Sequence, residues 1–256
     1  MPESDLALLT RAAEEAGKIA SRFWQQDPQV WDKPADAGPV TEADLAVDTM
    51  LKDVLLRARP DYGWLSEETE DDDARLTSEH VFIVDPIDGT RAFIDGKRTW
   101  AHSLAIARAG TVETAVVALP ERGKVYAATL GGGATLNGAA ITASPRTDLC
   151  GACTLAARPT FEDRYWPGGA PAVERHFRSS LAYRLCLVAE GRFDAMITLR
   201  DSWEWDVAAG TLIALEAGAV VTDRAGKDVR FNQPGAKGPG IMAMAPGIAG
   251  QIIALR

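Results

Sequence analysis

One short string, residues 84–90 (VDPIDGT), constrains the fold of this chain more than any other feature. The apolar run before it indicates a buried strand that stops at Asp85, because Pro86 cannot donate to a strand ladder. Gly89 permits a tight backbone bend, and Thr90 can begin a helix. A carboxylate at the end of a buried strand is costly unless something positive meets it. The string therefore predicts a strand-to-helix turn whose oxygens face a cation and whose free N–H groups face an anion.

Three further carboxylates gain meaning only when they are taken with this turn. Asp206 opens an expected helix, where the helix dipole alone would favour it. Asp44 follows Thr41 in the pattern of a capping box. Glu67 stands in an acidic stretch that would otherwise be a solvated loop. Their joint occurrence favours a divalent metal ion, which is the simplest positive partner for carboxylates that meet at the ends of apolar runs.

Composition limits the partners of the chain. Its 256 residues are 46% hydrophobic and 25% charged, which is ordinary for a soluble protein of one or two domains. The net charge of -9 argues against broad binding to nucleic acid or anionic membranes. The sequence has no recognisable signal peptide and no apolar run long enough for a membrane span. We therefore expect a cytoplasmic protein with no membrane or direct nucleic-acid partner.

Three cysteines, Cys150, Cys153 and Cys186, do not suggest a disulfide framework. The spacing of Cys150 and Cys153 is that of a redox or zinc pair. A closed zinc site would need a second pair or a nearby histidine, and the sequence shows neither. We expect these cysteines to be structural.

The first half, residues 1–145, has an α+β pattern. Ser4 caps an expected helix that runs to about Phe23, residues 25–39 form a loop, and Thr41 opens a second helix that ends at residues 60–63. Residues 71–73 continue an acidic loop. Strands are expected at 64–65 and 81–84, followed by an antiparallel meander at residues 103–109, 112–119 and 124–130.

The second half, residues 146–256, has an α/β alternation. Expected helices cover residues 173–177, 182–190 and 205–217. Expected strands cover residues 153–156, 193–198, 220–221 and 241–244.

Several motifs together resemble the inositol monophosphatase family of magnesium-dependent, lithium-sensitive phosphatases. They are residues 67–68 (EE), 85–90 (DPIDGT) and 205–210 (WDVAAG), with weaker likeness at 131–138 and 185–191. The resemblance covers nearly the whole chain. It implies a layered α-β-α-β-α sandwich, with an antiparallel sheet in the first half and a mixed or mostly parallel sheet in the second. It also implies a homodimer.

The resemblance assigns roles to the acidic residues. It implies two to three magnesium ions held by Glu67, Asp85, the carbonyl of Ile87, Asp88, Asp206 and, through water, Asp44. The catalytic residues would be Glu67, Asp85 and Thr90, with Thr90 and Glu67 together positioning and deprotonating the attacking water. One ion would lower the pKa of that water and another would stabilise the leaving alkoxide. Lys33 falls where the family often places a basic residue near the metals.

Substrate contacts are implied less sharply. The N–H groups of Gly89 and Thr90 would hold phosphate oxygens, and further contacts would come from Asp88, Ser180, Arg184 and Asp206. Arg184 could bind a second phosphate or simply be a solvated helix residue. His102 is more typical of a packed histidine than of a ligand.

The substrate itself stays open among small phosphate esters. Residues 90–96 (TRAFIDG) resemble the bisphosphate nucleotidase and histidinol-phosphatase branches more than the inositol phosphatases. The candidates are inositol monophosphate, 3'-phosphoadenosine 5'-phosphate, histidinol phosphate and fructose 1,6-bisphosphate. Some family members bind RNA polymerase or RNA-processing machinery, so a catalytically silent regulatory protein is the rival hypothesis. The intact acidic set argues against that rival.

Overall fold

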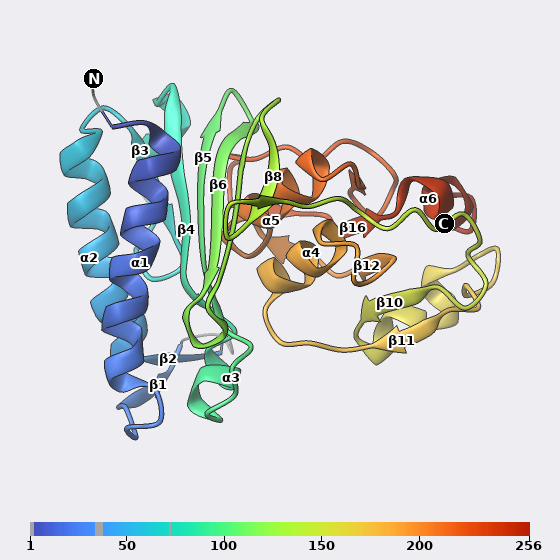
Figure 1. Cartoon of the computed structure of the whole chain (residues 1–256), viewed down its shortest axis with the longest axis horizontal. Coiled ribbons are helices and arrows are strands. Elements are labelled where there is room, and N and C mark those ends of the chain that lie inside the picture. Colours follow the sequence, from blue (N-terminus) through green and yellow to red (C-terminus); the bar gives the residue numbers. More distant parts are fainter. Residues whose placement is uncertain (1–2, 34–37, 72) are drawn as a thin grey trace.

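The computed structural model describes residues 3–33, 38–71 and 73–256 of the chain, which are arranged in five layers (Figure 1). Helices α1 (Asp5–Phe23) and α2 (Glu42–Ala58) cover one face of a seven-stranded sheet. Helices α4 (Leu181–Ala189) and α5 (Glu204–Glu216) fill the space between that sheet and a five-stranded sheet. Helix α6 (Pro246–Ile253) packs on the outer face of the second sheet. The predicted α-β-α-β-α sandwich is confirmed.

The seven-stranded sheet is almost entirely antiparallel. Its order is β3-β4-β5-β6-β7-β8-β9, with bounds Gly63–Ser66, His80–Asp88, Ala101–Arg108, Thr111–Leu119, Lys124–Thr129, Gly133–Leu136 and Ala139–Ala140. The predicted meander of β5, β6 and β7 is confirmed. Strand β3 is the exception, because it runs parallel to β4.

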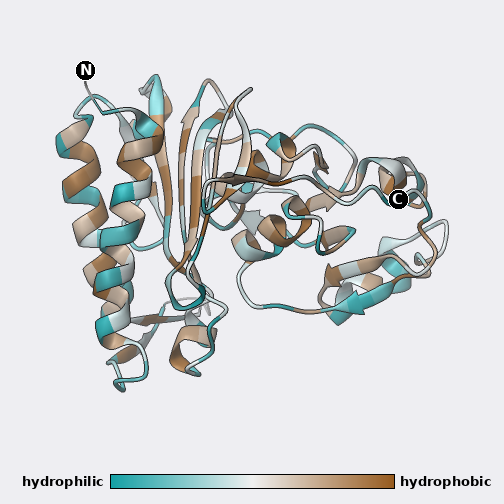
Figure 2. Ribbon diagram, viewed as in Figure 1, coloured by the Kyte–Doolittle hydropathy of each residue, from teal (hydrophilic) through white to brown (hydrophobic). Residues whose placement is uncertain are grey.

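Both faces of this sheet are buried, which explains the continuous apolar runs of its strands. Along β4, Phe82 and Val84 pack toward the α1–α2 layer, whereas Val81 and Ile83 pack toward α4 and α5. Helices α1 and α2 carry both hydrophilic and hydrophobic residues (Figure 2), as expected for helices that have one face on a sheet. Within the described ranges, no helix is both long and apolar enough to cross a membrane.

The five-stranded sheet is mixed, as predicted. Its order is β11-β10-β12-β16-β14, with bounds Glu174–His176, Cys153–Ala156, Ala195–Thr198, Ile241–Met244 and Val220–Thr222. Strand β10 runs parallel to both β11 and β12, while β16 runs antiparallel to β12 and β14. A further two-stranded pair joins β13 (Ser202–Trp203) to β15 (Lys237–Gly238).

Three local predictions are corrected by the structure. The helix expected at residues 173–177 is wrong, because Glu174–His176 form the edge strand β11 and a five-residue helix gains little by itself. The expected loop at residues 25–39 contains β1 (Val30–Asp32) and the start of β2 (Pro39–Thr41), which pair with each other. Residues 34–37 of that loop, and Asp72 of the acidic loop, lie outside the described residues.

The third correction concerns strand β4, which does not stop at Asp85 but continues to Asp88. Its pairing with β5 shifts register between Asp85 and Asp88. Pro86 therefore sits in a bulge, where no ladder hydrogen bond is required of its nitrogen. The irregularity places both aspartates of the string at the same end of the sheet.

Candidate active site

The acidic residues predicted from the sequence meet at this end of β4. Ligand oxygens of Glu67, Asp85 and Asp206 all lie within 4.8 Å of one another. Glu67 follows β3, which is parallel to β4, so the two strands deliver their carboxylates to the same edge. Asp206 lies in the first turn of α5, which packs against the inner face of the sheet. Three segments far apart in sequence thus converge on one small space.

The surroundings of Asp85 and Asp206 strongly disfavour the charged forms of both carboxyl groups. Burial, followed by repulsion from Glu67, raises the pKa of Asp85 well above its ordinary value. Burial and repulsion from Asp88 do the same to the pKa of Asp206. The Oδ1 atom of Asp85 has no hydrogen-bond partner in the part of the chain that the structure describes. Buried, mutually repelling oxygens with an unsatisfied acceptor fit a bound divalent cation.

Asp88 is held in place by the start of helix α4. Its Oδ2 atom accepts hydrogen bonds from the hydroxyl of Ser180 and the backbone N–H of Ala182, both at 2.7 Å. Burial nevertheless raises the pKa of Asp88 to about 6. Ser180, predicted as a substrate contact, lines the same cavity as Asp88, but its hydroxyl already donates a hydrogen bond to Asp88.

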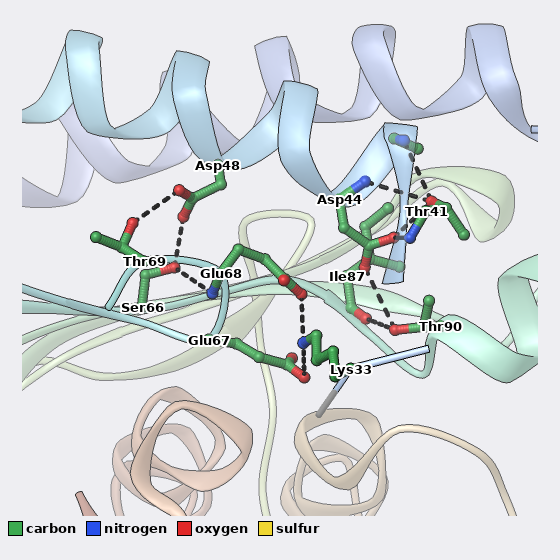
Figure 3. Close-up of polar contacts among 11 residues, drawn as sticks. Lys33, Thr41, Asp44, Asp48, Ser66, Glu67, Glu68, Thr69, Ile87 and Thr90 are labelled. Atoms are coloured by element: carbon green, nitrogen blue, oxygen red, sulfur yellow. Dashed lines mark hydrogen bonds and ion pairs between the residues drawn. The ribbon is translucent and has the colours of Figure 1, made fainter. Parts of the chain in front are cut away.

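Asp44 lies behind the turn and is bound to threonines (Figure 3). Its Oδ2 accepts from the backbone N–H and the hydroxyl of Thr41, at 2.9 and 2.5 Å, which completes the predicted capping box. The hydroxyl of Thr90 lies 3.3 Å from Asp44 Oδ1 and 3.2 Å from the carbonyl oxygen of Ile87. Burial raises the pKa of Asp44 to about 6. The Thr90 hydroxyl therefore hydrogen-bonds directly to Asp44, because the first turn of α2 brings Asp44 within reach.

Lys33 supplies a positive charge beside the carboxylates. Its Nζ lies 2.7 Å from Glu67 Oε1 and 2.7 Å from Glu68 Oε1 (Figure 3). Burial acts to lower the pKa of Lys33, but attraction to Glu67 and hydrogen bonds to both glutamates outweigh it and raise that pKa. Burial, and then repulsion from Glu67, raises the pKa of Glu68 to about 7. The position of Lys33 agrees with the prediction of a basic residue near the acidic set.

His102 lies on strand β5 and packs against the bulge of strand β4. Its Nδ1 contacts the carbonyl oxygen of Pro86, and its side chain is fully buried. Burial lowers the pKa of His102 to about 4, so the imidazole is neutral at physiological pH. This is the packed histidine that the sequence favoured.

The carboxylates open into a cavity of about 420 Å³. Gly89 and Thr90 form part of its wall, and Gly89 has a φ of 102°, a conformation that suits glycine. A neighbouring cavity of about 230 Å³ shares three wall residues with the first: Phe177, Arg184 and Arg200. The site thus has an acidic end and a basic end.

Two of these wall residues were not predicted from the sequence. Arg200 follows β12, and Phe177 follows β11, whose strand character was missed. The Arg184 guanidinium lies over the Phe177 ring, 4.4 Å from its centroid, and its Nε donates to the carbonyl of Arg178 at 2.5 Å. Arg184 is therefore buried in the wall of the pocket and is not a solvated helix residue.

Comparison with known proteins gives a consistent result. The family model described as "Inositol monophosphatase family" matches residues 1–254. An inositol-1-monophosphatase of Rhizobium meliloti is 36% identical over 234 residues, covering 86% of each chain. The Nus factor SuhB of Pseudomonas aeruginosa is 33% identical over 236 residues, again covering 86% of each chain.

Solved structures show the same fold. An IMPase of Thermotoga maritima superposes with a TM-score of 0.82 at 26% identity, covering 96% of this chain and 93% of the other. The extragenic suppressor protein suhB of Bartonella henselae has a TM-score of 0.78 at 31% identity, covering 97% and 96%. The family match and the fold match both extend over most of the chain, and the chain belongs to the inositol monophosphatase family.

Proposed function

We propose that this protein is a magnesium-dependent phosphomonoesterase that hydrolyses a small phosphate ester such as inositol monophosphate. The observation that carries the proposal is the convergence of Glu67, Asp85 and Asp206, in which Asp85 Oδ1 is buried and has no hydrogen-bond partner among the described residues. The residues that would hold two to three magnesium ions are Glu67, Asp85, the Ile87 carbonyl, Asp88, Asp206 and, through water, Asp44. Bound magnesium supplies an acidified water and neutralises phosphate charge.

The protein groups around this centre have separate tasks. Asp44 and the Ile87 carbonyl orient the Thr90 hydroxyl, which would hold the attacking water together with Glu67. Gly89 and Thr90 line the cavity, and their N–H groups would bind phosphate oxygens. The start of α4 fixes the orientation of Asp88 through two hydrogen bonds. Positioning and charge stabilisation account for most of the catalysis that phosphoryl transfer needs.

The basic end of the cavity bears on the choice of substrate. Arg184 and Arg200 both line the cavity that contains Asp88 and Asp206. Paired guanidinium groups suit a second phosphate, which favours 3'-phosphoadenosine 5'-phosphate as the second candidate. Histidinol phosphate and fructose 1,6-bisphosphate are further alternatives. Turnover of inositol 1-phosphate, 3'-phosphoadenosine 5'-phosphate and histidinol phosphate, measured side by side in magnesium, ranks them.

A phosphate-release assay tests the proposal itself. Asp206→Asn should abolish turnover of every ester while the circular dichroism spectrum stays unchanged. Asp201→Asn is the matched control, because that carboxylate is exposed and pairs only with Arg224 among the described residues. Lithium should inhibit the wild-type protein by competing for an oxygen-lined magnesium site. Near-normal activity of the Asp206 variant would rule out the metal-centred mechanism.

A binding protein is the rival function, since relatives of this chain are named Nus factors. A regulatory protein without catalysis would release no phosphate from any of these esters. We propose that the chain is an enzyme located in the cytoplasm and that it forms a homodimer. Sedimentation of the purified protein measures the dimer directly.

A further inference from the structure

A second group of metal-ligating side chains lies at the edge of the five-stranded sheet. Cys153 is on β10, and Glu174 and His176 are two residues apart on the neighbouring edge strand β11. The parallel register pairs Cys153 with Glu174 and Leu155 with His176. Because side chains alternate between faces along a strand, the three side chains share one face of the sheet. None of them lines the cavity that contains Glu67, Asp88 and Asp206, which we call the acidic pocket.

The ligand atoms of this group are already close together. The sulfur of Cys153, a carboxylate oxygen of Glu174 and an imidazole nitrogen of His176 lie within 4.8 Å of one another. The His176 Nε2 atom is 2.9 Å from Glu174 Oε1, and the Cys153 Sγ atom is 3.9 Å from Glu174 Oε2. Zinc bonds of about 2.0–2.3 Å bridge ligand separations of this size. Small side-chain rotations would place all three atoms around one ion.

The surrounding structure holds the Cys153 backbone and the His176 ring in place. The N–H of Cys153 donates to Asp194 Oδ2 at 2.8 Å, and the Cys153 carbonyl accepts from the N–H of Asp194 at 2.9 Å. The ring of His176 packs edge-on against Phe193, with centroids 5.3 Å apart. Cys153 and His176 are half-buried, and Glu174 is exposed. The site is therefore supported on strands and remains open to solvent on one side.

We propose that Cys153, Glu174 and His176 bind one zinc ion, with a solvent molecule as the fourth ligand. A thiolate, an imidazole and a carboxylate form a donor set that suits zinc, whereas magnesium favours oxygen ligands alone. The two metal sites of the molecule would thus select different ions. The Cys153 thiol gives up its proton to solvent when the ion binds. Cys150, in an exposed turn, is outside the ligand set.

This zinc site would act on the architecture of the substrate pocket and not on the chemistry. It closes the long connection between β10 and β11 and fastens an edge strand to its neighbour. The residue after β11 is Phe177, which lines the pocket and supports the Arg184 guanidinium. Zinc should therefore raise the Tm of the full-length protein, since it binds the folded state.

Cobalt substitution tests the proposal with a readout that the acidic pocket cannot produce. The full-length protein is cleared of metal with a chelator, saturated with magnesium and titrated with Co²⁺. One equivalent of Co²⁺ should give the near-ultraviolet charge-transfer band of a thiolate ligand. Cys153→Ser should remove the band, and Glu174→Gln and His176→Gln should each weaken Co²⁺ binding at least tenfold.

Matched variants serve as controls. Cys150→Ser should keep the band, and so should His80→Gln, which removes a histidine that faces Glu113 at 3.9 Å without a cysteine. Zinc should raise the Tm of the wild type but not that of the Cys153 variant. Absence of the band in the wild type, its persistence without Cys153, or its loss in the Cys150 variant would each overturn the assignment. So would unchanged affinity in both the Glu174 and His176 variants.

Discussion

At the scale of single residues, the acidic pocket opposes the stability of the protein when no metal is bound. Asp44 and Asp88 each have a pKa raised to about 6 from an ordinary value of 3.8. Between pH 3.8 and about pH 6 the folded state binds more protons than the unfolded state. The contribution of these two carboxyl groups to the free energy of unfolding is therefore fully present below pH 3.8, and it is lost as the pH rises through about 6. In chelator, the Tm should therefore decline from pH 4 to pH 7 through this contribution. Added magnesium should reverse the decline at pH 7.

Replacement of Asp88 separates stability from function. Asp88→Asn keeps an oxygen for Ser180 and Ala182 but removes a buried charge. We expect it to raise the Tm of the metal-free protein at pH 7, by about 2–4 °C for each kcal/mol of repulsion relieved. The same variant should lose phosphatase activity. Calorimetry in chelator and phosphate release in magnesium check the two halves, and a lower Tm would contradict the electrostatic argument.

For Lys33 we expect a different result, because its ammonium group forms an ion pair with Glu67. Lys33→Met should lower the Tm of the metal-free protein, since Glu67 and Glu68 lose their counter-ion. It should also tighten magnesium binding, because a competing positive charge is gone. Lys97→Met removes an exposed ion pair with Asp95 and should change neither property. A titration of activity with magnesium measures this affinity. Weaker magnesium binding in the Lys33 variant would refute the proposal that the Lys33 ammonium competes with magnesium.

At the scale of elements, a close contact between α4 and α5 bears on the site. Helix α5 passes α4 at Gly210, where an added Cβ would lie 2.6 Å from the Cβ of Leu185. Gly210→Ala should push α5, which carries Asp206, away from α4, whose N-cap residue is Ser180. We expect a loss of about 1–3 kcal/mol of unfolding free energy, together with reduced activity.

Gly250 provides the matched control for this prediction. It lies inside α6, and an added Cβ there meets nothing within 4 Å. Gly250→Ala should stabilise the protein by about 0.5–1 kcal/mol, because alanine favours helix. Denaturant unfolding of the two variants should give shifts of opposite sign. Equal shifts would show that helix propensity and not crowding decides the outcome at Gly210.

The elements also show where inference from the sequence reaches its limit. Strands β5, β6 and β7 and helix α1 follow from periodicity and turn residues, because local packing and local pattern agree there. Strand β11 does not, since only its pairing with β10 defines it. The acidic residues could be named because they sit beside strand and helix ends. Phe177 and Arg200 could not, because they reach the pocket through tertiary packing that no local spacing encodes.

At the scale of the whole molecule, the two halves share one core. The cluster around α4 and α5 combines residues of the first sheet, such as Ile83 and Ala105, with residues of the second, such as Met196 and Ala243. Arg75 adds a polar link, because its guanidinium donates to Asn232 Oδ1 at 2.6 Å and to the Gln233 carbonyl at 3.0 Å. Neither half buries its inner face alone.

We therefore expect a single cooperative thermal transition for the full chain. A fragment of residues 1–145 should remain largely unfolded, because its sheet would expose the face that α4 and α5 cover. Arg75→Met should lower the Tm without splitting the transition. Two separate calorimetric peaks, or a stable native-like fragment, would show instead that the halves are independent domains.

Helices α4 and α5 follow all strands of the seven-stranded sheet in the sequence, which affects folding during synthesis. Asp206 follows Asp88 by 118 residues (206 minus 88), so the proposed metal-binding set stays incomplete until most of the chain has been made. At about 5–20 residues per second, that gap lasts roughly 6–24 s. Once β9 has been made, the nascent chain contains all seven strand segments of the first sheet, but the apolar residues that α4 and α5 cover still lack their partners. A ribosome making this protein thus holds an inactive, largely unfolded half-molecule that is prone to aggregate. The emergence of α5 allows its apolar residues to be buried and delivers the last carboxylate.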